Sequence, residues 1–231
     1  HWGRLAVAEF EKIENLDQLE RWLTTQDIRM SRTIAARAAL RALPDLMPAL
    51  YNPSSAKLLL AGLRATLISG AASTFPSQDL NRVKKASYAA SASVEPYGDS
   101  FPAASAAAYA STFDFSAAAA ADTVYISTRS ARAHSDNSAA AALSAAASDA
   151  ALGETHDRHQ IFNHPLWSTT DDDEQLLQQW QAFEARPDPE GIWSFWRDWY
   201  RGMLNGEPLD WGLQLQVALI EIAQSVRRIT N

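Results

Sequence analysis

The amino-acid sequence predicts an all-α fold, an irregular bundle of about eight or nine helices in which alanine-rich helices pack closely. The chain of 231 residues contains 43 Ala and 24 Leu, but only 16 Val and Ile residues together. Ala and Leu are strong helix formers, whereas β-strands are enriched in β-branched residues. Helix caps and prolines also interrupt the hydrophobic periodicity at helix-length intervals. This balance argues against an all-β or doubly wound α/β fold.

Two helices are predicted near the start of the chain. Leucines at helical spacing after the cap residue Asn15 predict a short amphipathic helix over residues 15–26. The Ala- and Arg-rich run that follows predicts a helix over 31–43. This helix should stop before Pro44, because the residue that precedes a proline avoids the α region. We expect Pro44 and Pro48 to lie in a loop or a single turn.

A third helix is predicted from Asn52-Pro53 to Gly70. Asn is a favoured N-cap residue and Pro is favoured at the first helical position. Leucines at helical spacing follow over residues 58–67. Ser77 is expected to begin a fourth helix.

The middle of the chain has a different composition. Residues 86–151 include 26 Ala and 13 Ser among 66 residues. Because Ala is the best helix former and its methyl group lets helix axes approach closely, this composition favours tightly packed helices. An aromatic stripe at four-residue spacing marks one of them and contains Phe101, Tyr109 and Phe113.

Two shorter features lie in this middle region. Residues 138–152 predict a helix that Gly153 closes. Residues 124–128, Val-Tyr-Ile-Ser-Thr, form the one local run with β-strand character.

The C-terminal region is rich in tryptophan, with five of the eight Trp residues between Trp180 and Trp211. Thr170 and the acidic residues after it predict a helix start, because negative charge is favourable in the first turn. An Asp-Pro pair at Asp188 predicts a second helix over 189–204, and Asp210 is expected to cap a last one. Asn205-Gly206 should end the second of these helices.

The predicted 189–204 helix carries its apolar residues on roughly half of its circumference. Such a division of faces is what core burial produces, so we expect Trp193, Trp196 and Trp199 to be mainly structural. The alternative is an exposed aromatic platform for a sugar, a choline-like cation or a partner helix.

We expect residues 1–231 to form a single all-helical domain. In this arrangement the alanine-rich helices pack against the leucine-rich N-terminal and tryptophan-rich C-terminal helices. Consistent cap, propensity and periodicity signals along the chain support this arrangement. The change in composition near Gly153 marks the alternative subdivision.

Four arginines are candidate binding residues. Arg37 and Arg41 share a face of the predicted 31–43 helix, where they suit an acidic partner or a phosphate, or else a solvated face paired with Asp or Glu. Arg197 and Arg201 lie beside the tryptophan face, where they suit an anion.

Three histidines lie close together in the sequence, at 156, 159 and 164. On a helix His156 and His159 would point to one side, and imidazole is a ligand that suits zinc. His156 and His159 are therefore the candidate metal ligands, although the two-His spacing of zinc proteases is absent. The alternative is that they are solvated loop residues.

The function expected from these features is protein–protein interaction without catalysis. No Gly-x-Ser-x-Gly elbow or phosphate-binding glycine-rich loop occurs, and we expect no cofactor. The alternative function is a hydrolase or metal-dependent enzyme that uses the region of His156 and His159.

The net charge of the chain limits the class of binding partner, and its hydropathy limits the cellular location. A formal net charge of −7 argues against a general nucleic-acid surface, because that binding depends on Lys and Arg, and suits a basic protein partner. No run resembles a membrane span, so we expect a soluble, cytoplasmic protein. The chain begins at His1 rather than Met, and we expect it to be a piece or a trimmed form of a longer product.

Two blocks of sequence carry a resemblance. The first is Ile-Ala-Ala-Arg-Ala-Ala-Leu-Arg-Ala-Leu-Pro over 34–44, and the second is Trp-Ser-Phe-Trp-Arg-Asp-Trp-Tyr over 193–200 with Leu-Asn-Gly-Glu-Pro-Leu-Asp-Trp over 204–211. Together they resemble a group of uncharacterised bacterial proteins that combine an Ala- and Arg-rich helix, an Ala-rich middle and a Trp-rich C-terminal segment. The resemblance implies a helical fold and transfers no activity, ligand or catalytic residue.

Overall fold

The architecture was analysed in a computed structural model. It describes residues 13–51, 56–75, 106, 107, 110, 116–132, 136–167 and 174–219. The expected helix start at Ser77 and the caps at Asn52 and Thr170 lie outside these residues, as do the aromatic residues of the expected 101–113 stripe.

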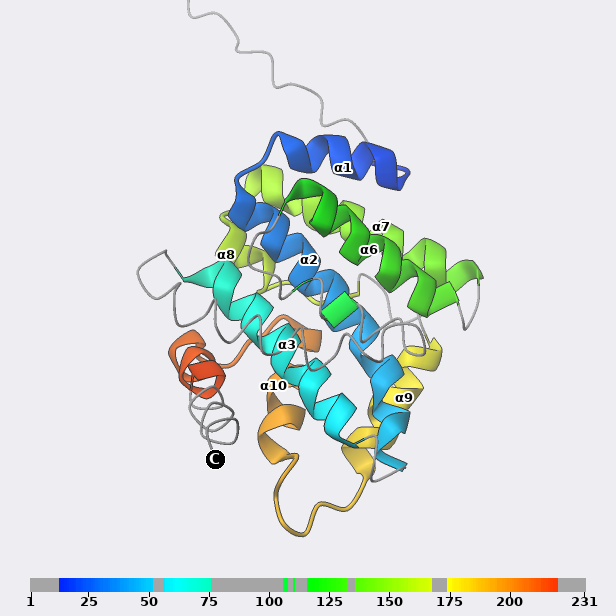
Figure 1. The fold of residues 1–231 in the computed structure, drawn as a ribbon, viewed down its shortest axis with the longest axis vertical. Coiled ribbons are helices and arrows are strands. Elements are labelled where there is room, and N and C mark those ends of the chain that lie inside the picture. The colour runs from blue at the N-terminus through cyan, green and yellow to red at the C-terminus, as the bar shows by residue number, and fades with distance from the viewer. Residues whose placement is uncertain are drawn as a thin grey trace, which may run out of the picture.

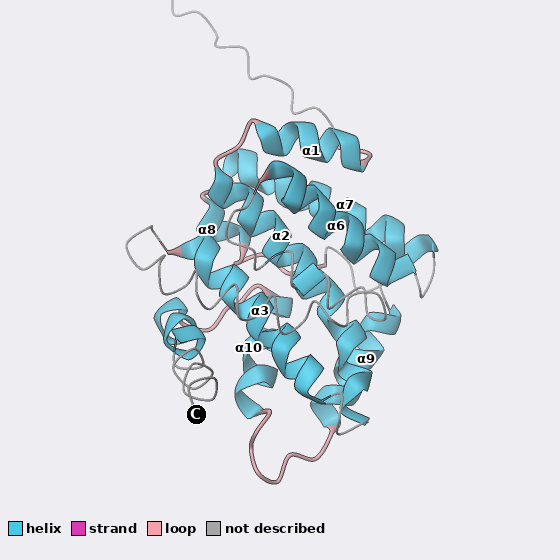
Figure 2. Cartoon of the chain, in the orientation of Figure 1, coloured by secondary structure: helices cyan, strands magenta, loops and turns pink. Residues whose placement is uncertain are grey.

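All regular structure among the described residues is helical, and none of it is strand (Figure 2). The prediction of an all-α fold is therefore confirmed. The elements in chain order are α1 (Leu16–Thr24), α2 (Ile28–Ala42), the 3-10 helix η1 (Leu43–Tyr51), α3 (Ala56–Thr74), α6 (Ala117–Arg132), α7 (Asp136–Thr155), α8 (Arg158–Ile161), α9 (Glu174–Ala185) and α10 (Ser194–Asn205). Residues 211–219 are also helical.

Helix α2 runs through the middle of the bundle (Figure 1). Every residue from Met30 to Ala42 is buried, including its polar and charged ones. Small side chains on most of its circumference let neighbouring helices approach from several sides at once. Helix α2 consequently contacts α3, α6, α7, α8 and η1.

The bounds of α2 differ from the predicted 31–43. The helix begins at Ile28, because the carboxylate of Asp27 accepts a hydrogen bond from the backbone N–H of Arg29 at 2.8 Å. The α-helix ends at Ala42, one residue before the predicted end at 43, and so it stops ahead of Pro44 as expected. Pro44 and Pro48 then lie in the 3-10 helix η1 rather than in a loop.

Two buried clusters share α2. The first, here called the leucine–tryptophan core, combines Ala36 and Leu40 of α2 with side chains from η1, α3, α9 and α10. The second, here called the alanine core, combines Ala35 and Ala39 of α2 with side chains from α1, α6 and α7. Figure 1 shows α6 and α7 on one side of α2 and α3 on the other.

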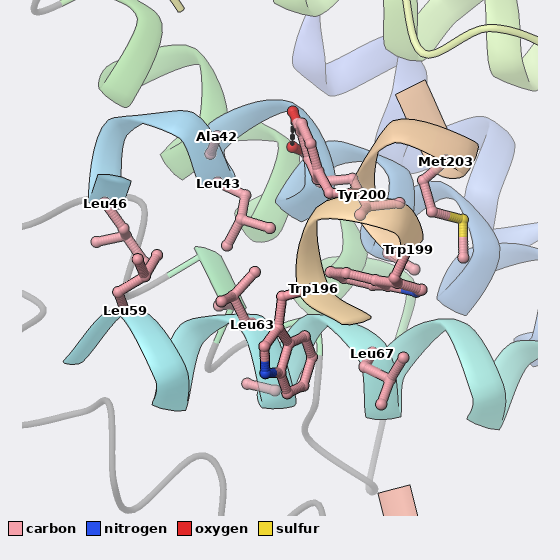
Figure 3. Close-up of a cluster of buried hydrophobic side chains, with 14 of the residues drawn as sticks. Ala42, Leu43, Leu46, Leu59, Leu63, Leu67, Trp196, Trp199, Tyr200 and Met203 are labelled. Carbon is pink, nitrogen blue, oxygen red and sulfur yellow. Dashed lines mark hydrogen bonds between the residues drawn. The ribbon is translucent and has the colours of Figure 1, made fainter. Parts of the chain in front are cut away.

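The aromatic face of α10 closes the leucine–tryptophan core. Trp196, Trp199, Tyr200 and Met203 are all buried, and Trp196 points towards Leu63 of α3 (Figure 3). These side chains pack into the core, and the polar atoms of Trp199 and Tyr200 are hydrogen-bonded there, as is usual for buried Trp and Tyr. The indole N–H of Trp199 donates to Gln214 Oε1 at 3.0 Å, and the Tyr200 hydroxyl donates to the carbonyl of Leu40 at 3.1 Å.

Two glycines expected to end helices lie inside them instead. Helix α3 continues past Gly70 to Thr74, and α7 continues past Gly153 to Thr155. A Cβ atom at Gly70 would lie 3.6 Å from the Trp211 ring, and one at Gly153 would lie 3.0 Å from the Met30 side chain. Neighbouring large side chains therefore occupy the space beside these glycines.

The strand character of residues 124–128 does not produce a strand. These residues lie within α6, where Val124 and Ser127 are buried at helical spacing. The Ser127 hydroxyl donates to the carbonyl of Ala38 in α2 at 2.9 Å. The run stays helical because the alanine-rich flank and packing on α2 outweigh its local β-propensity.

Helix α10 is shorter at its start than the predicted 189–204. Asp188 accepts hydrogen bonds from the backbone N–H groups of Ile192 and Trp193, at 3.0 and 2.8 Å, and so organises a turn before the helix begins at Ser194. The predicted stop is confirmed, since Gly206 caps the helix in the left-handed conformation with φ +76°.

The change in composition near Gly153 does not coincide with a division of the core. The leucine–tryptophan core combines residues between 36 and 68 with residues between 162 and 218. Side chains from both sides of Gly153 therefore pack into the same cluster. None of the helices within the described ranges is long and apolar enough to cross a bilayer.

We predict that Trp196→Ala lowers the free energy of unfolding by about 3–5 kcal/mol, because the indole is buried and its removal leaves a cavity between α10 and α3. Urea denaturation followed by circular dichroism measures this change. Ile192→Ala, at an exposed neighbouring position, serves as the control and should shift stability by less than about 0.5 kcal/mol. An unchanged unfolding midpoint for Trp196→Ala would show that the indole is not part of the core.

Candidate functional site

Two arginines of α2 and one aspartate of α7 form a buried ion cluster. Arg37 and Arg41 lie one helical turn apart, and both side chains are directed at Asp149. Arg37 Nε donates to Asp149 Oδ1 at 2.9 Å. Arg41 Nη2 lies 2.7 Å from Asp149 Oδ2 but does not meet hydrogen-bond geometry there, so this contact is an ion pair only. The three side chains are no more than 2% exposed.

The backbone of residues 161–166 completes the cluster. Arg37 Nη1 donates to the carbonyls of Ile161 and His164, both at 2.9 Å, and Nη2 donates to that of Pro165 at 2.7 Å. Arg41 Nε donates to the carbonyl of Leu166 at 2.8 Å. The two guanidinium groups thus hold the segment that connects α8 to the C-terminal region.

The end of α10 covers the other side of the same segment. The backbone N–H of Leu166 donates to the carbonyl of Leu204 at 3.1 Å. A Cβ atom at Gly206 would lie only 2.6 Å from the His164 carbonyl carbon and 2.8 Å from the Pro165 nitrogen. Glycine is therefore required at position 206 for two reasons, namely its positive φ and this close approach of the backbone.

The cluster holds two positive charges against one carboxylate. Burial lowers the pKa of Arg37, and the charge of Asp149 opposes this shift. Arginine nevertheless stays protonated in proteins, so the excess charge must be solvated by the protein itself. The four carbonyl groups supply this solvation, since hydrogen bonds to charged groups contribute about 1.5–3 kcal/mol each.

One nitrogen of the cluster has no hydrogen-bond acceptor. Arg41 Nη1 is buried without a hydrogen-bond partner. The Arg41 guanidinium carbon lies 5.8 Å from the centre of the Trp167 ring, within the range of a cation–π contact. The indole face therefore provides part of the electrostatic compensation on that side.

The sequence-based view of Arg37 and Arg41 as residues of a solvated or partner-binding face is wrong. Both side chains pair with Asp149, so the expected pairing with an Asp or Glu residue does occur. However, these ion pairs are buried, and the guanidinium groups face the protein interior rather than solvent or a partner. The error has a physical cause. The positions looked solvent-facing because they are charged, whereas α2 is surrounded on all sides.

Arg197 and Arg201 do not converge on an anion site. Arg201 donates to Glu184 at 2.6 Å and to Asp198 at 2.7 Å. These hydrogen bonds raise the pKa of Arg201. Arg197 donates to the carbonyl of Arg186 and lies over the Phe183 ring at 5.2 Å. The charge of Arg201 is thus already matched by protein carboxylates.

The two candidate metal ligands lie near the end of α7. His156 follows that helix and is exposed, while His159 belongs to α8 and its side chain lies outside what the structure describes. The ring of His156 instead lies beside that of His164, with centroids 5.4 Å apart. Among the described side chains, no group of three or more His, Cys, Asp or Glu is arranged to hold a metal.

The outer face of α7 carries a groove that sequence reasoning missed. Its volume is about 530 Å³, and it is lined by Ile13, Glu14, Ala140, Leu143, Ser144, Ala147, Ser148 and Ala151. The α7 members recur at spacings of three or four residues, so they form one stripe along the helix. This periodicity was readable in the sequence, but the alanine-rich pattern did not distinguish an outward stripe from an inward one.

Comparisons with protein-family models, with curated proteins and with solved structures found no match.

We predict that Asp149→Asn lowers the free energy of unfolding by about 3–5 kcal/mol, because it leaves two buried guanidinium groups without a counter-charge. Asp136→Asn in the same helix is the matched control. That carboxylate is exposed, and its replacement should cost less than about 0.5 kcal/mol. Urea denaturation of both variants measures the difference, and equal midpoints would contradict the proposed importance of the cluster.

Proposed function

We propose that this protein is a non-enzymatic helical protein that mediates protein–protein interaction through the groove on the outer face of α7. The occupant we propose is an amphipathic helix of a partner protein. The single observation that carries the proposal is the groove itself, about 530 Å³ in volume and lined mainly by small and apolar side chains.

The composition of the stripe suits a helix as occupant. Ala140 and Ala151 are exposed, and Leu143 and Ala147 are half-buried. Short side chains let a second helix lie with its backbone close to α7, so that dispersion contacts accumulate over the whole length of the contact. An occupant helix would then place apolar residues at i, i+3, i+4 and i+7 into the groove.

The serines between the alanines do not make the face strongly polar. Ser144 and Ser148 both line the groove. The Ser148 hydroxyl donates to the carbonyl of Ser144 at 2.9 Å, so its hydrogen-bonding capacity is partly used within α7. Burial of this face under a partner would therefore cost little in lost hydrogen bonds to water.

The charge of the chain favours a partner with basic residues around its apolar face. The formal net charge is −7, and Glu14 lies at the rim of the groove. Complementary charge of this kind accelerates association and selects partners more than it adds affinity. The same charge argues against nucleic acid as the partner.

A bacterial origin and a cytoplasmic location are part of the proposal. The origin is supported by the resemblance of the two sequence blocks to bacterial proteins. Fractionation of the native host with an antibody to this chain tests the location.

We predict that Ala140→Arg and Ala151→Arg each abolish partner binding, because a long charged side chain fills the groove at an exposed position where the fold tolerates it. Ala182→Arg, at an exposed position of α9 outside the groove, is the matched control. Affinity capture from the native host, followed by mass spectrometry, compares the four proteins. The expected result is a stoichiometric partner that wild type and Ala182→Arg retain and both groove variants lose.

A direct measurement of contact accompanies the capture. The chain has no cysteine, so Ser144→Cys provides a unique attachment point for a photoreactive label inside the groove. Crosslinks to a helical segment of the captured partner support the proposal. Capture that is equal for all four proteins, or turnover of a small molecule by the purified chain with no partner captured, would overturn it.

A further inference from the structure

We propose that His156 and His164 form a two-imidazole binding site for a divalent transition-metal ion of the zinc class. The fold brings their rings together from two different elements, the end of α7 and the loop after α8. The ring centroids are 5.4 Å apart, and the ring planes are inclined at 76°. This pairing differs from the pair at 156 and 159 that the sequence suggested.

The separation of the rings fits shared coordination. Each zinc–nitrogen bond is about 2.0–2.1 Å long, and two such bonds diverge at the tetrahedral angle. Two imidazoles that ligate one ion therefore have ring centroids roughly 5 Å apart. The observed 5.4 Å requires only a small adjustment of exposed side chains.

Among the hydrogen bonds of the described residues, the Thr155 hydroxyl contacts only the Nδ1 side of the His156 ring. The Thr155 hydroxyl lies 3.3 Å from the carbonyl of Leu152, to which it donates, and 2.7 Å from His156 Nδ1. The contact with Nδ1 is the shorter of the two, and which partner donates in it depends on the tautomer of the ring. In the tautomer that carries its proton on Nδ1, the ring donates to the Thr155 hydroxyl, and Nε2 keeps the lone pair that binds the ion. Metal-ligating histidines commonly use this arrangement, in which the second ring nitrogen is held by a hydrogen bond.

The position of His164 is fixed by the buried ion cluster. Its carbonyl accepts a hydrogen bond from Arg37 Nη1 at 2.9 Å, and its backbone N–H donates to the carbonyl of Ile161 at 3.2 Å. Gly206 packs against the same peptide group. A ligand whose backbone is held in this way loses little conformational freedom when it binds an ion.

Access and local charge also suit a cation. His156 is exposed and His164 is half-buried, so an ion can reach both rings from solvent. Glu154 and Asp157 flank His156 in the sequence and are exposed, so two carboxylates lie near the pair along the chain. Water completes the coordination, because the described residues supply no third ligand.

This site is independent of the proposed function, since neither histidine lines the groove on α7. Failure of one proposal therefore leaves the other standing.

Titration of the intact chain with Zn²⁺ in an isothermal calorimeter tests the proposal. We expect one ion per chain, and at least about tenfold weaker binding for His156→Ala and for His164→Ala. Thr155→Val should also weaken binding by about tenfold, whereas Thr155→Ser retains the hydroxyl and should bind as wild type does. His134→Ala is the control for binding by any histidine.

Two further measurements keep the test decisive. Melting temperatures without metal show whether each variant folds, and Zn²⁺ should raise the melting temperature of wild type but not of the two histidine variants. In wild type, ¹⁵N spectra should show the His156 Nε2 signal shifting on addition of Zn²⁺. Absence of this shift, or equal Zn²⁺ affinity in wild type, His156→Ala and His164→Ala, would show that the rings merely pack against each other.

Discussion

The buried ion cluster of Arg37, Arg41 and Asp149 is the constraint on which the rest of this structure depends. Removal of a charge from water costs several kcal/mol, and mutual attraction offsets this cost only when the geometry is good and the remaining donors are bonded. Here one carboxylate serves two guanidinium groups, and four carbonyls of residues 161–166 each accept one further hydrogen bond from them. The cluster is therefore favourable only when α2, α7 and this segment are all in place together.

This requirement links parts of the chain that have little else in common. Helix α2 belongs to the alanine core and to the leucine–tryptophan core, and the ion cluster lies where it meets the segment after α8. Leu204 and Gly206, at the end of α10, fasten the same segment from the other side. A displacement of any one of these elements would leave buried polar groups without partners, and each such group costs about 1–3 kcal/mol.

Helix α7 has two faces with different roles. Asp149 and Ala150 are buried, while Ala140, Ser144 and Ala151 are exposed on the groove side. The charge on the inner face fixes the helix against α2, so the outer face is a rigid surface. A preformed surface loses little entropy on binding, so this rigidity would favour the proposed binding of a partner helix in the groove.

The fold class and much of the local structure follow from residues that lie close together in the sequence. The side chain of Asn15 accepts a hydrogen bond from the backbone N–H of Gln18, and that of Asp210 accepts one from the backbone N–H of Leu213, both at 2.9 Å. Gly206 ends α10. All three features are expected from local capping rules. These features depend on residues within a few positions of one another, where propensity and capping act. The burial of Trp196 and Trp199 likewise follows from the hydrophobic periodicity of one helix.

Only the tertiary structure decided the roles of the charged residues and of several glycines. Arg37 finds its carbonyl acceptors 124 to 128 residues further along the chain, and no local pattern encodes such a partner. Gly153 lies within α7 with the Met30 side chain packed beside it, and His156 lies beside His164 because the loop after α8 turns back beside the end of α7. Sequence periodicity reports which faces are apolar, but the position of a charge relative to distant backbone carbonyls is set only when the helices pack.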